Sequence, residues 1–402
     1  MKHKIIAALI LLLMLVGQIG TDVYLASLPA IHVALQTSLR QVQYTFSVFL
    51  AGFAVSQLCY GPLSDRYGRR PLILWGLMLY SVAGLWCFLS THIAELLFAR
   101  VLQGVGAGAC TVVARAIMRD VFDGKDLDKI NIYQSMVWSM VPISAPLIGS
   151  YIQQYLGWRY NFLFLVLISV TLLLACWFKL PETHQTRESV LHIKNILDDY
   201  KNILCHQQFI AYLLFCTCIV SLFAIFNVSA PLIIQILFKQ SVVVYGWSVL
   251  SVAITFTVGS LISRVLTRQL SSKKLMLLGV SIIVLADLAW MLINTRGQSS
   301  LYTFLMPFML IQIGSAFAFP SAAAESMRLY TQKSGKVAAI FGCTLFLGSA
   351  ISSGIMSRLP VTNLIPFSIM LTVLIVMMVL AYVLILKYAQ TVHDSGGNTD
   401  DH

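Results

Sequence analysis

The sequence of 402 residues is 58% hydrophobic and only 11% charged, with a formal net charge of +11. Soluble domains average about 25% charged residues, so this chain has too few charges to cover a surface exposed to water. The composition excludes a soluble enzyme and a disordered chain, and it indicates a protein whose main solvent is lipid. The net charge alone is also compatible with a nucleic-acid partner, so the positions of the 27 lysines and arginines decide its meaning.

Long apolar runs divide the chain into membrane-spanning segments. A bilayer core needs about 20 mostly apolar residues per helix, and continuous runs favour helices over the alternating strands of a barrel. The first run resembles a signal peptide, but it continues to Ile31 without a convincing cleavage site of small residues. The sequence predicts twelve spans with short loops and no separate soluble domain, at 5–31, 42–63, 72–90, 94–117, 130–152, 160–179, 208–237, 246–266, 275–294, 301–324, 337–358 and 363–386.

The basic residues lie mostly on one side of these spans. With both termini in the cytoplasm, as twelve spans require, 21 basic residues are cytoplasmic and Arg100 lies within a span. Five are on the outer side, namely Arg40, Arg159, Lys239, Arg296 and Arg358. Cytoplasmic loops of membrane proteins carry such an excess. The net charge therefore reports topology, and we expect no nucleic-acid partner.

The longest polar stretch in the interior of the chain, 180–207, separates two sets of six spans. Apolar residues recur at helical spacing within it and predict an amphipathic helix on the inner membrane surface. Three residues ending the second span recur 198 positions later at the end of the eighth (Gly61, Leu63 and Arg66; Gly259, Leu261 and Arg264). Two parallel halves around a midplane substrate site are a known transporter design. We predict bundles over 1–180 and 208–387, a linker over 181–207 and a cytoplasmic tail over 388–402.

Ionisable residues within the spans are candidate functional groups, because each costs about 2.5–3.5 kcal/mol to insert at a helix centre. Asp22 and Arg100 are the strongest candidates, and Gln103 shares a helix face with Arg100. A structural hydrogen bond or a position near the outer interface is the alternative for Asp22. The remaining acidic residues of the spans are interpreted as structural or boundary charges (Glu95, Asp287 and Glu325).

The loop between the second and third spans carries a family signature. Residues 61–73 read GPLSDRYGRRPLI and resemble the signature loop of the major facilitator superfamily, Gly-x-Leu-x-Asp-Arg-x-Gly-Arg-Arg/Lys. A charged turn that obeys the positive-inside rule would explain the arginines, but not their combination with Asp and two glycines. The resemblance implies a cytoplasmic gate that latches the halves, formed by Gly61, Asp65, Arg66, Gly68, Arg69, Arg70 and Asp120.

Other segments resemble the drug/proton antiporters of this superfamily, and specifically their Bcr/CflA branch. They are Thr21–Leu25 with Pro29, Arg100–Gly104, Arg115–Asp120, the helix 5 motif Pro142, Pro146 and Gly149, and Gly157–Arg159 with Phe162. The resemblance implicates Arg100 in proton transfer. The chain departs from it at Ala26, where the branch commonly has Pro, and at Ala145 and Ser150, where antiporters commonly have Gly.

These observations predict an all-α integral membrane protein with the major facilitator fold, in two pseudo-symmetric bundles of six helices. We expect a monomer in the bacterial inner membrane that exports small amphipathic, drug-like compounds. Protons acting through Asp22, Arg100 and Gln103 would drive it without a cofactor, metal or catalytic residue. Candidates for the cavity wall are Tyr24, Trp138 and Asn227. The alternatives are export of an endogenous metabolite such as a siderophore or amino acid, an uptake symporter, and a membrane-embedded enzyme or sensor.

Overall fold

The elements of the first half are all helices in the computed structural model, which describes residues 2–184, 193–295, 299–330 and 334–396. They are α1 (Lys2–Asp22), the 3₁₀ segment η1 (Leu25–Ser27), α2 (Leu28–Ala34), α3 (Leu39–Tyr67), α4 (Arg69–Leu89), α5 (Ile93–Val121), α6 (Gly124–Tyr155) and α7 (Trp158–Lys179). These helices cover the first six predicted spans, except for Ser90 and a break within the first span, and extend past most of their ends.

The second half repeats this pattern after the amphipathic linker helix α8 (Ile193–Leu204). Its elements are α9 (Gln207–Leu232), the π-helical turn η2 (Ile233–Leu237), α10 (Val242–Leu266), α11 (Ser272–Thr295), α12 (Leu301–Arg328), α13 (Ser334–Met356) and α14 (Ile365–Gly396). The prediction of twelve helical spans and a linker helix is therefore confirmed.

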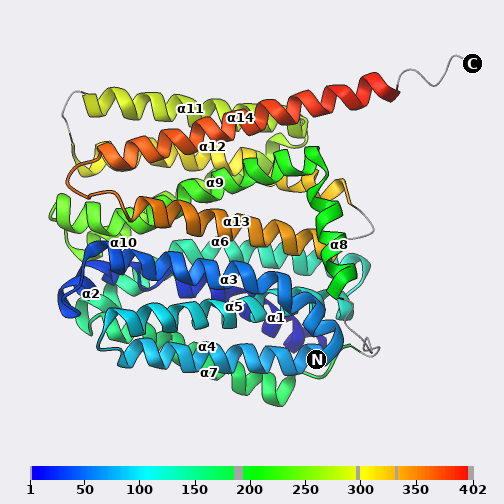
Figure 1. The fold of residues 1–402 in the computed structure, drawn as a ribbon, viewed down its shortest axis with the longest axis horizontal. Helices are drawn as coiled ribbons and strands as arrows, with labels where there is room; N and C mark the ends of the chain where they lie inside the picture. Colours follow the sequence, from blue (N-terminus) through cyan, green and yellow to red (C-terminus); the bar gives the residue numbers. More distant parts are fainter. Residues whose placement is uncertain (1, 185–192, 296–298, 331–333, 397–402) are drawn as a thin grey trace, which may run out of the picture.

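The helices run side by side along the long axis of the molecule (Figure 1). The first-half helices α3, α4, α5 and α7 lie together, the second-half helices α9, α11, α12 and α14 lie together, and α8 crosses one end. We call this the basic end; α1 begins there and α14 ends there. Across the halves, α3 packs against α13 and α6 packs against α10.

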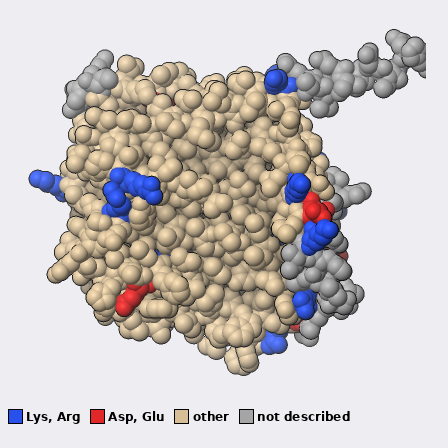
Figure 2. Space-filling model, in the orientation of Figure 1, with Lys and Arg blue, Asp and Glu red and all other residues tan. Residues whose placement is uncertain are grey.

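The outer surface is apolar over a broad band. Figure 2 shows Lys and Arg side chains toward the two ends and an uncharged face between them. Within the described residues, eleven helical segments are long and apolar enough to cross a membrane. The span formed by α6 is not among them, although it is 32 residues long. Because α6 packs against α1 and α10, it needs less apolar surface than a helix surrounded by lipid.

The first span is not the continuous helix that we predicted over 5–31. The α-helix ends at Asp22, and one 3₁₀ turn precedes α2. Pro29 lies in the first turn of α2 and has no N–H for the carbonyl of Leu25. The N–H of Leu28 bonds that carbonyl instead, which tightens the backbone into a 3₁₀ turn. The break therefore forms with Ala26 in place of the usual Pro.

Glycines allow the helices to approach with their backbones in contact. A Cβ atom on Gly76 would lie 3.1 Å from the carbonyl oxygen of Gly106, and a Cβ on Gly106 would lie 2.7 Å from that of Gly76. The same exchange occurs in the second half, at 2.5 and 2.6 Å, between Gly279 and Gly314. Lipid supplies no hydrophobic drive for helix association, so close packing of small residues takes its place. The pair α4–α5 thus corresponds to α11–α12.

We expect Gly314→Ala to destabilise the protein by about 1–3 kcal/mol, the usual cost of overpacking a close contact. The added methyl would lie 2.6 Å from a backbone oxygen that cannot rotate away. The thermal midpoint of the detergent-solubilised protein measures this. Gly354→Ala is the matched control, since its methyl would meet only Ser47, at 3.9 Å. Equal midpoints for the two variants would contradict the packing argument.

Candidate functional site

Asp22 is the last residue of α1, at the break in the first span. Its side chain is 3% exposed. One carboxyl oxygen, Oδ1, accepts a hydrogen bond of 3.0 Å from Thr21 Oγ1. The other, Oδ2, has no hydrogen-bond partner among the described residues. Asp22 is therefore a buried carboxyl with one unused oxygen, and no cation is paired with it in the described part of the chain.

Arg100 lies fully buried in α5, which packs against α1. Its Nε donates to the carbonyl of Thr45 at 3.3 Å. Its Nη1 donates to the carbonyl of Gly20 at 3.1 Å and to Gln103 Oε1 at 2.7 Å. The guanidinium is therefore held by neutral oxygens of α1, α3 and its own helix, and no ion pair with a carboxylate occurs among the described residues.

Aromatic rings stabilise this isolated positive charge. The guanidinium carbon lies 4.2 Å from the ring centres of both Tyr24 and Phe49. A desolvated cation–π contact is worth about 2 kcal/mol, so two of them offset a substantial part of the cost of burial. Tyr24, which we predicted for the cavity wall, therefore lies against Arg100 and also shares a 3.1 Å hydrogen bond with Thr45.

The structure brings Asp22, Arg100 and Gln103 into one region without joining Asp22 directly to Arg100. Arg100 contacts residues on both sides of Asp22, namely Gly20 and Tyr24. A change in the charge of Asp22 can therefore alter the contacts of Arg100, because the broken turn of the first span links the two residues. Gln103 orients Arg100, and its own amide nitrogen has no partner among the described residues.

Tyr245 was missed in the sequence analysis. It lies in α10 of the other half, is fully buried, and its hydroxyl has no hydrogen-bond partner among the described residues. Its helix contacts η1, the segment that follows Asp22 and Tyr24. A lone tyrosine early in an apolar helix carries no sequence signal for this position. Asp22 and Tyr245 are therefore buried polar residues of the two halves, each with an oxygen that has no partner among the described residues.

The predicted helix 5 motif lies in α6, at the point where α6 packs against the break in the first span. Pro142 and Pro146 lie inside α6. A Cβ on Gly149 would lie only 1.7 Å from the carbonyl oxygen of Val23, so only glycine fits there. Asn161 fastens the contact by donating to the carbonyl of Gly149 at 3.2 Å and to a serine hydroxyl of η1 at 2.8 Å.

The departure at Ser150 is compensated across the interface. A Cβ on Gly246 of α10 would lie 2.6 Å from Ser150 Oγ. The small residue needed at this crossing therefore lies on α10 instead of α6, and the serine hydroxyl donates back to the carbonyl of Pro146 at 2.7 Å. Of the remaining cavity candidates, Asn227 is buried in α9, and the side chain of Trp138 lies outside the described residues.

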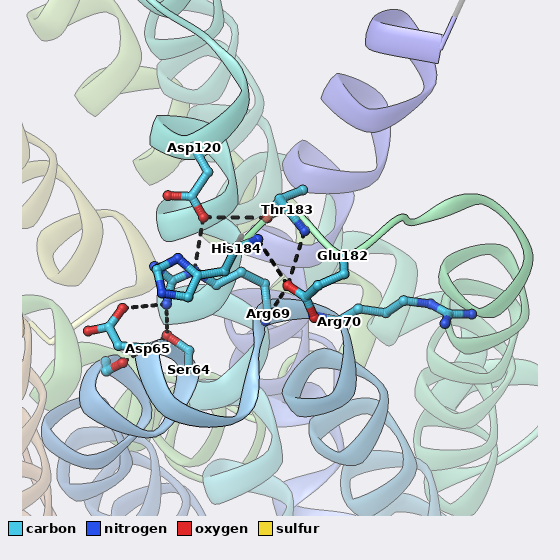
Figure 3. Close-up of polar contacts among 9 residues, drawn as sticks. Ser64, Asp65, Arg69, Arg70, Asp120, Glu182, Thr183 and His184 are labelled. Carbon is cyan, nitrogen blue, oxygen red and sulfur yellow. Dashed lines mark hydrogen bonds and ion pairs between the residues drawn. The ribbon is translucent and has the colours of Figure 1, made fainter. Parts of the chain in front are cut away.

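A second cluster occupies the basic end and contains most of the predicted gate (Figure 3). Arg69 Nη1 donates to Ser64 Oγ and Asp65 Oδ1, each at 2.5 Å. Its Nε pairs with Asp120 Oδ2 at 2.9 Å. This network joins α3, α4 and α5, all from the first half. The predicted latch residues therefore meet one another here, and their described ion pairs do not cross to the second half.

Glu182, after α7, completes the network and was not predicted. Its carboxylate accepts from the backbone N–H groups of Arg69 at 2.9 Å and Arg70 at 3.3 Å, the first two residues of α4. Gly68 makes this possible through its φ of 96°, and a Cβ there would lie 2.4 Å from the carboxylate. Burial disfavours the charged form of Glu182, but four backbone N–H donors outweigh it and lower the pKa of the carboxyl.

The remaining gate residues surround these contacts. Gly61 has open space around it. Arg70 donates to the carbonyl of Trp177 at 2.7 Å, which ties α4 to α7. The Arg66 guanidinium lies 5.1 Å from the ring centre of Tyr67.

The two ends of the interface between the halves differ. At the basic end, a cavity of about 400 Å³ lies between α3 and α5 of the first half and α13 of the second. Toward the opposite end, Gln43 donates to the carbonyl of Val228 at 3.0 Å, and Gln235 donates to that of Ala26, also at 3.0 Å. Polar bonds therefore close one end of the interface while the other is hollow.

Two helical bundles, a buried charge cluster beside their interface and a cavity at one end define a multi-pass membrane transporter. Residues 10–353 match the profile of the Major Facilitator Superfamily, and the chain belongs to this family. The crystal structure of a D-xylose-proton symporter superimposes with a TM-score of 0.78 and 13% sequence identity, covering 96% of this chain and 97% of that one, which shows the shared fold. The enzyme alternative is therefore wrong.

Several curated relatives span nearly the whole chain. A chloramphenicol resistance protein of Pseudomonas aeruginosa is 31% identical over 366 residues, covering 88% of this chain and 85% of the relative. Multidrug resistance protein MdtL of Shewanella oneidensis is 29% identical, with 90% of each chain covered. Multidrug resistance protein D of Escherichia coli is 28% identical, covering 91% of this chain and 92% of the relative.

We expect Arg100→Lys to reduce transport at least about tenfold and to lower the thermal midpoint of the protein. Lysine keeps the charge but cannot reproduce the planar set of donors that bonds α1, α3 and Gln103 at once. Uptake into inverted vesicles and the thermal midpoint measure the two effects. Arg159→Lys is the control, because Arg159 also contacts a ring and a carbonyl but at a partly exposed position. Full transport by Arg100→Lys would show that charge alone suffices.

We expect Glu182→Gln to lower stability by about 1 kcal/mol at neutral pH, because a charged cap at a helix N-terminus is lost. A carboxyl whose pKa is lowered by folding stabilises the fold above its unfolded pKa. That contribution disappears as the pH falls through the folded pKa. The difference in thermal midpoint between wild type and variant should therefore shrink as the pH is lowered from 7 toward 3. A difference independent of pH would contradict this assignment.

Proposed function

We propose that this chain is a proton-driven exporter of small amphipathic, drug-like compounds in the bacterial inner membrane and a member of the Bcr/CflA branch of its superfamily. Three relatives, from three bacteria, are named for chloramphenicol or multidrug resistance, which supports drugs as substrates. The excess of basic residues supports a cytoplasmic basic end with both termini on that side. The transporter acts as a monomer and takes its energy from the proton gradient, without a cofactor.

The observation that carries the proton coupling is the unused carboxyl oxygen of Asp22. A carboxyl buried without a cation binds a proton readily, because burial disfavours its charged form. Asp22 also lies where the first span is broken, just before η1, which contacts α10 of the other half. Its protonation state can therefore change contacts within the first half and across the interface together.

The cycle follows from requiring that substrate and proton favour different states of one equilibrium. Substrate enters the cavity at the cytoplasmic end, and the closed end opens to release it outside. Asp22 then takes up a proton from outside and releases it inward when the cavity re-forms. Arg100, held against Gly20 and Tyr24, adjusts the proton affinity of Asp22 through the broken turn between them.

Asp22→Asn tests this function directly, with chloramphenicol as the probe in inverted vesicles. We expect the variant to lose uptake driven by a pH gradient, because its amide cannot exchange a proton. It should retain exchange of labelled for unlabelled chloramphenicol, which needs no net proton movement.

Asp287→Asn is the matched control, since Asp287 is likewise a buried carboxyl of a span, held by Thr372 at 3.0 Å. It should keep gradient-driven uptake. Gradient-driven uptake by Asp22→Asn at the wild-type rate would remove Asp22 from the mechanism. A wild-type protein that moves no chloramphenicol and confers no resistance to other drugs would favour an endogenous metabolite.

A further inference from the structure

The cavity at the basic end carries positive charge that the protein does not neutralise. Its acidic residues, Asp65 and Asp120, are both paired with Arg69, at 2.5 and 2.9 Å. Arg115 and Arg119 also line the cavity, and neither forms an ion pair within the described ranges. These two arginines are four residues apart on α5, where like charges repel each other. An anion between them would remove that repulsion.

Polar atoms without partners occur at the same cavity. Gln57 is 0% exposed and lines it, yet neither its amide nitrogen nor its amide oxygen has a hydrogen-bond partner among the described residues. The Nε of Arg115 is buried and equally unpartnered. Leaving a buried polar group unsatisfied costs about 1–3 kcal/mol. Both side chains line one cavity and one of them is cationic, so an entering carboxylate or phosphate oxygen would supply the acceptor that they lack.

The position of the cavity connects this binding site to transport. Its wall includes Gly335 and Lys336 of α13 in the second half and Tyr200 of the linker helix. The Arg119 guanidinium lies 3.6 Å from the position of a Cβ on Gly335. A compound bound at Arg115 and Gln57 would therefore touch both halves before it reached the buried charge cluster.

We propose that this cavity receives the anionic group, a carboxylate or phosphate, of compounds that the protein exports. The inference rests on the export function proposed above and adds the charge of the substrate to it. Arg115, Arg119 and Gln57 bind the anionic group, and the same positive potential repels cations. The protein therefore prefers the anionic over the cationic form of otherwise similar amphipathic compounds.

Binding is tested with purified protein in phosphatidylcholine nanodiscs and labelled chloramphenicol hydrogen succinate, an anionic ester of a neutral drug. We expect saturable binding that tetraphenylphosphonium, a cation, does not displace. Arg115→Gln should weaken binding about tenfold, the usual size for loss of one charged hydrogen bond. Gln57→Glu, which adds a negative charge to the cavity, should weaken it at least as much.

Two further variants separate the site from folding and from general charge. Arg115→Lys keeps the positive charge but lacks the Nε–H donor, so it should recover part of the binding that Arg115→Gln loses without reaching the wild-type affinity. Arg268→Gln removes an exposed basic residue outside the cavity lining and should bind normally. Equal weakening by Arg268→Gln and Arg115→Gln would reduce the effect to overall charge and overturn the proposal. Displacement of the ester by phosphatidylglycerol in the nanodiscs would assign the site to a lipid headgroup and also overturn it.

Transport distinguishes this inference from the proposed function. In inverted vesicles, Arg115→Gln should lower the ratio of ester uptake to chloramphenicol uptake about tenfold relative to wild type. If neither compound is transported but the ester binds in a manner that depends on Arg115, drug export fails and the anion site stands. If chloramphenicol is transported and the ester binds equally to wild type and Arg115→Gln, drug export stands and the anion site is wrong.

Discussion

The burial of Arg100 is the constraint on which the first half depends. A guanidinium in the membrane must find oxygen acceptors, since removing them would leave an isolated charge in a medium of low dielectric constant. Three acceptors come from three places, the carbonyls of Gly20 and Thr45 and the side chain of Gln103. The bonds of Nε and Nη1 therefore fix α1, α3 and α5 relative to one another, while Nη2 has no partner among the described residues. The same bonds also place the break in the first span, and with it Asp22, close to a buried cation.

The main features of the fold follow from the sequence because they depend on neighbouring residues. Apolar length predicts each helix, the polar stretch predicts the linker, and the Asp, Arg and Gly of 61–70 predict a charged turn that the structure forms. The break in the first span is harder to predict from the sequence, because the apolar run continues without interruption to Ile31. Pro29 was the local clue, because a missing N–H affects the carbonyl four residues earlier.

The parts that could not be predicted depend on contacts between distant segments. Glu182 caps α4 although more than 100 residues separate them, and nothing in its own surroundings indicates that role. Ser150 departs from the antiporter pattern, and Gly246 on α10 supplies the small residue that this helix crossing needs. The sequence around Ser150 does not indicate this compensation. The unpartnered hydroxyl of Tyr245 is likewise a property of packing and not of the sequence near it.

The hydrogen bonds at the end opposite the cavity determine how much free energy the protein needs to open that end. The described hydrogen bonds across the halves there are few, and they are mostly neutral, such as Gln43 to Val228 and Ser47 to Ser353. Each contributes about 1 kcal/mol net. A charge that crosses a membrane potential of about 100 mV releases about 2.3 kcal/mol. The free energy needed to break these bonds is therefore of the same order as the energy released when one or two protons cross the membrane. Buried ion pairs in place of these neutral hydrogen bonds would have required much more.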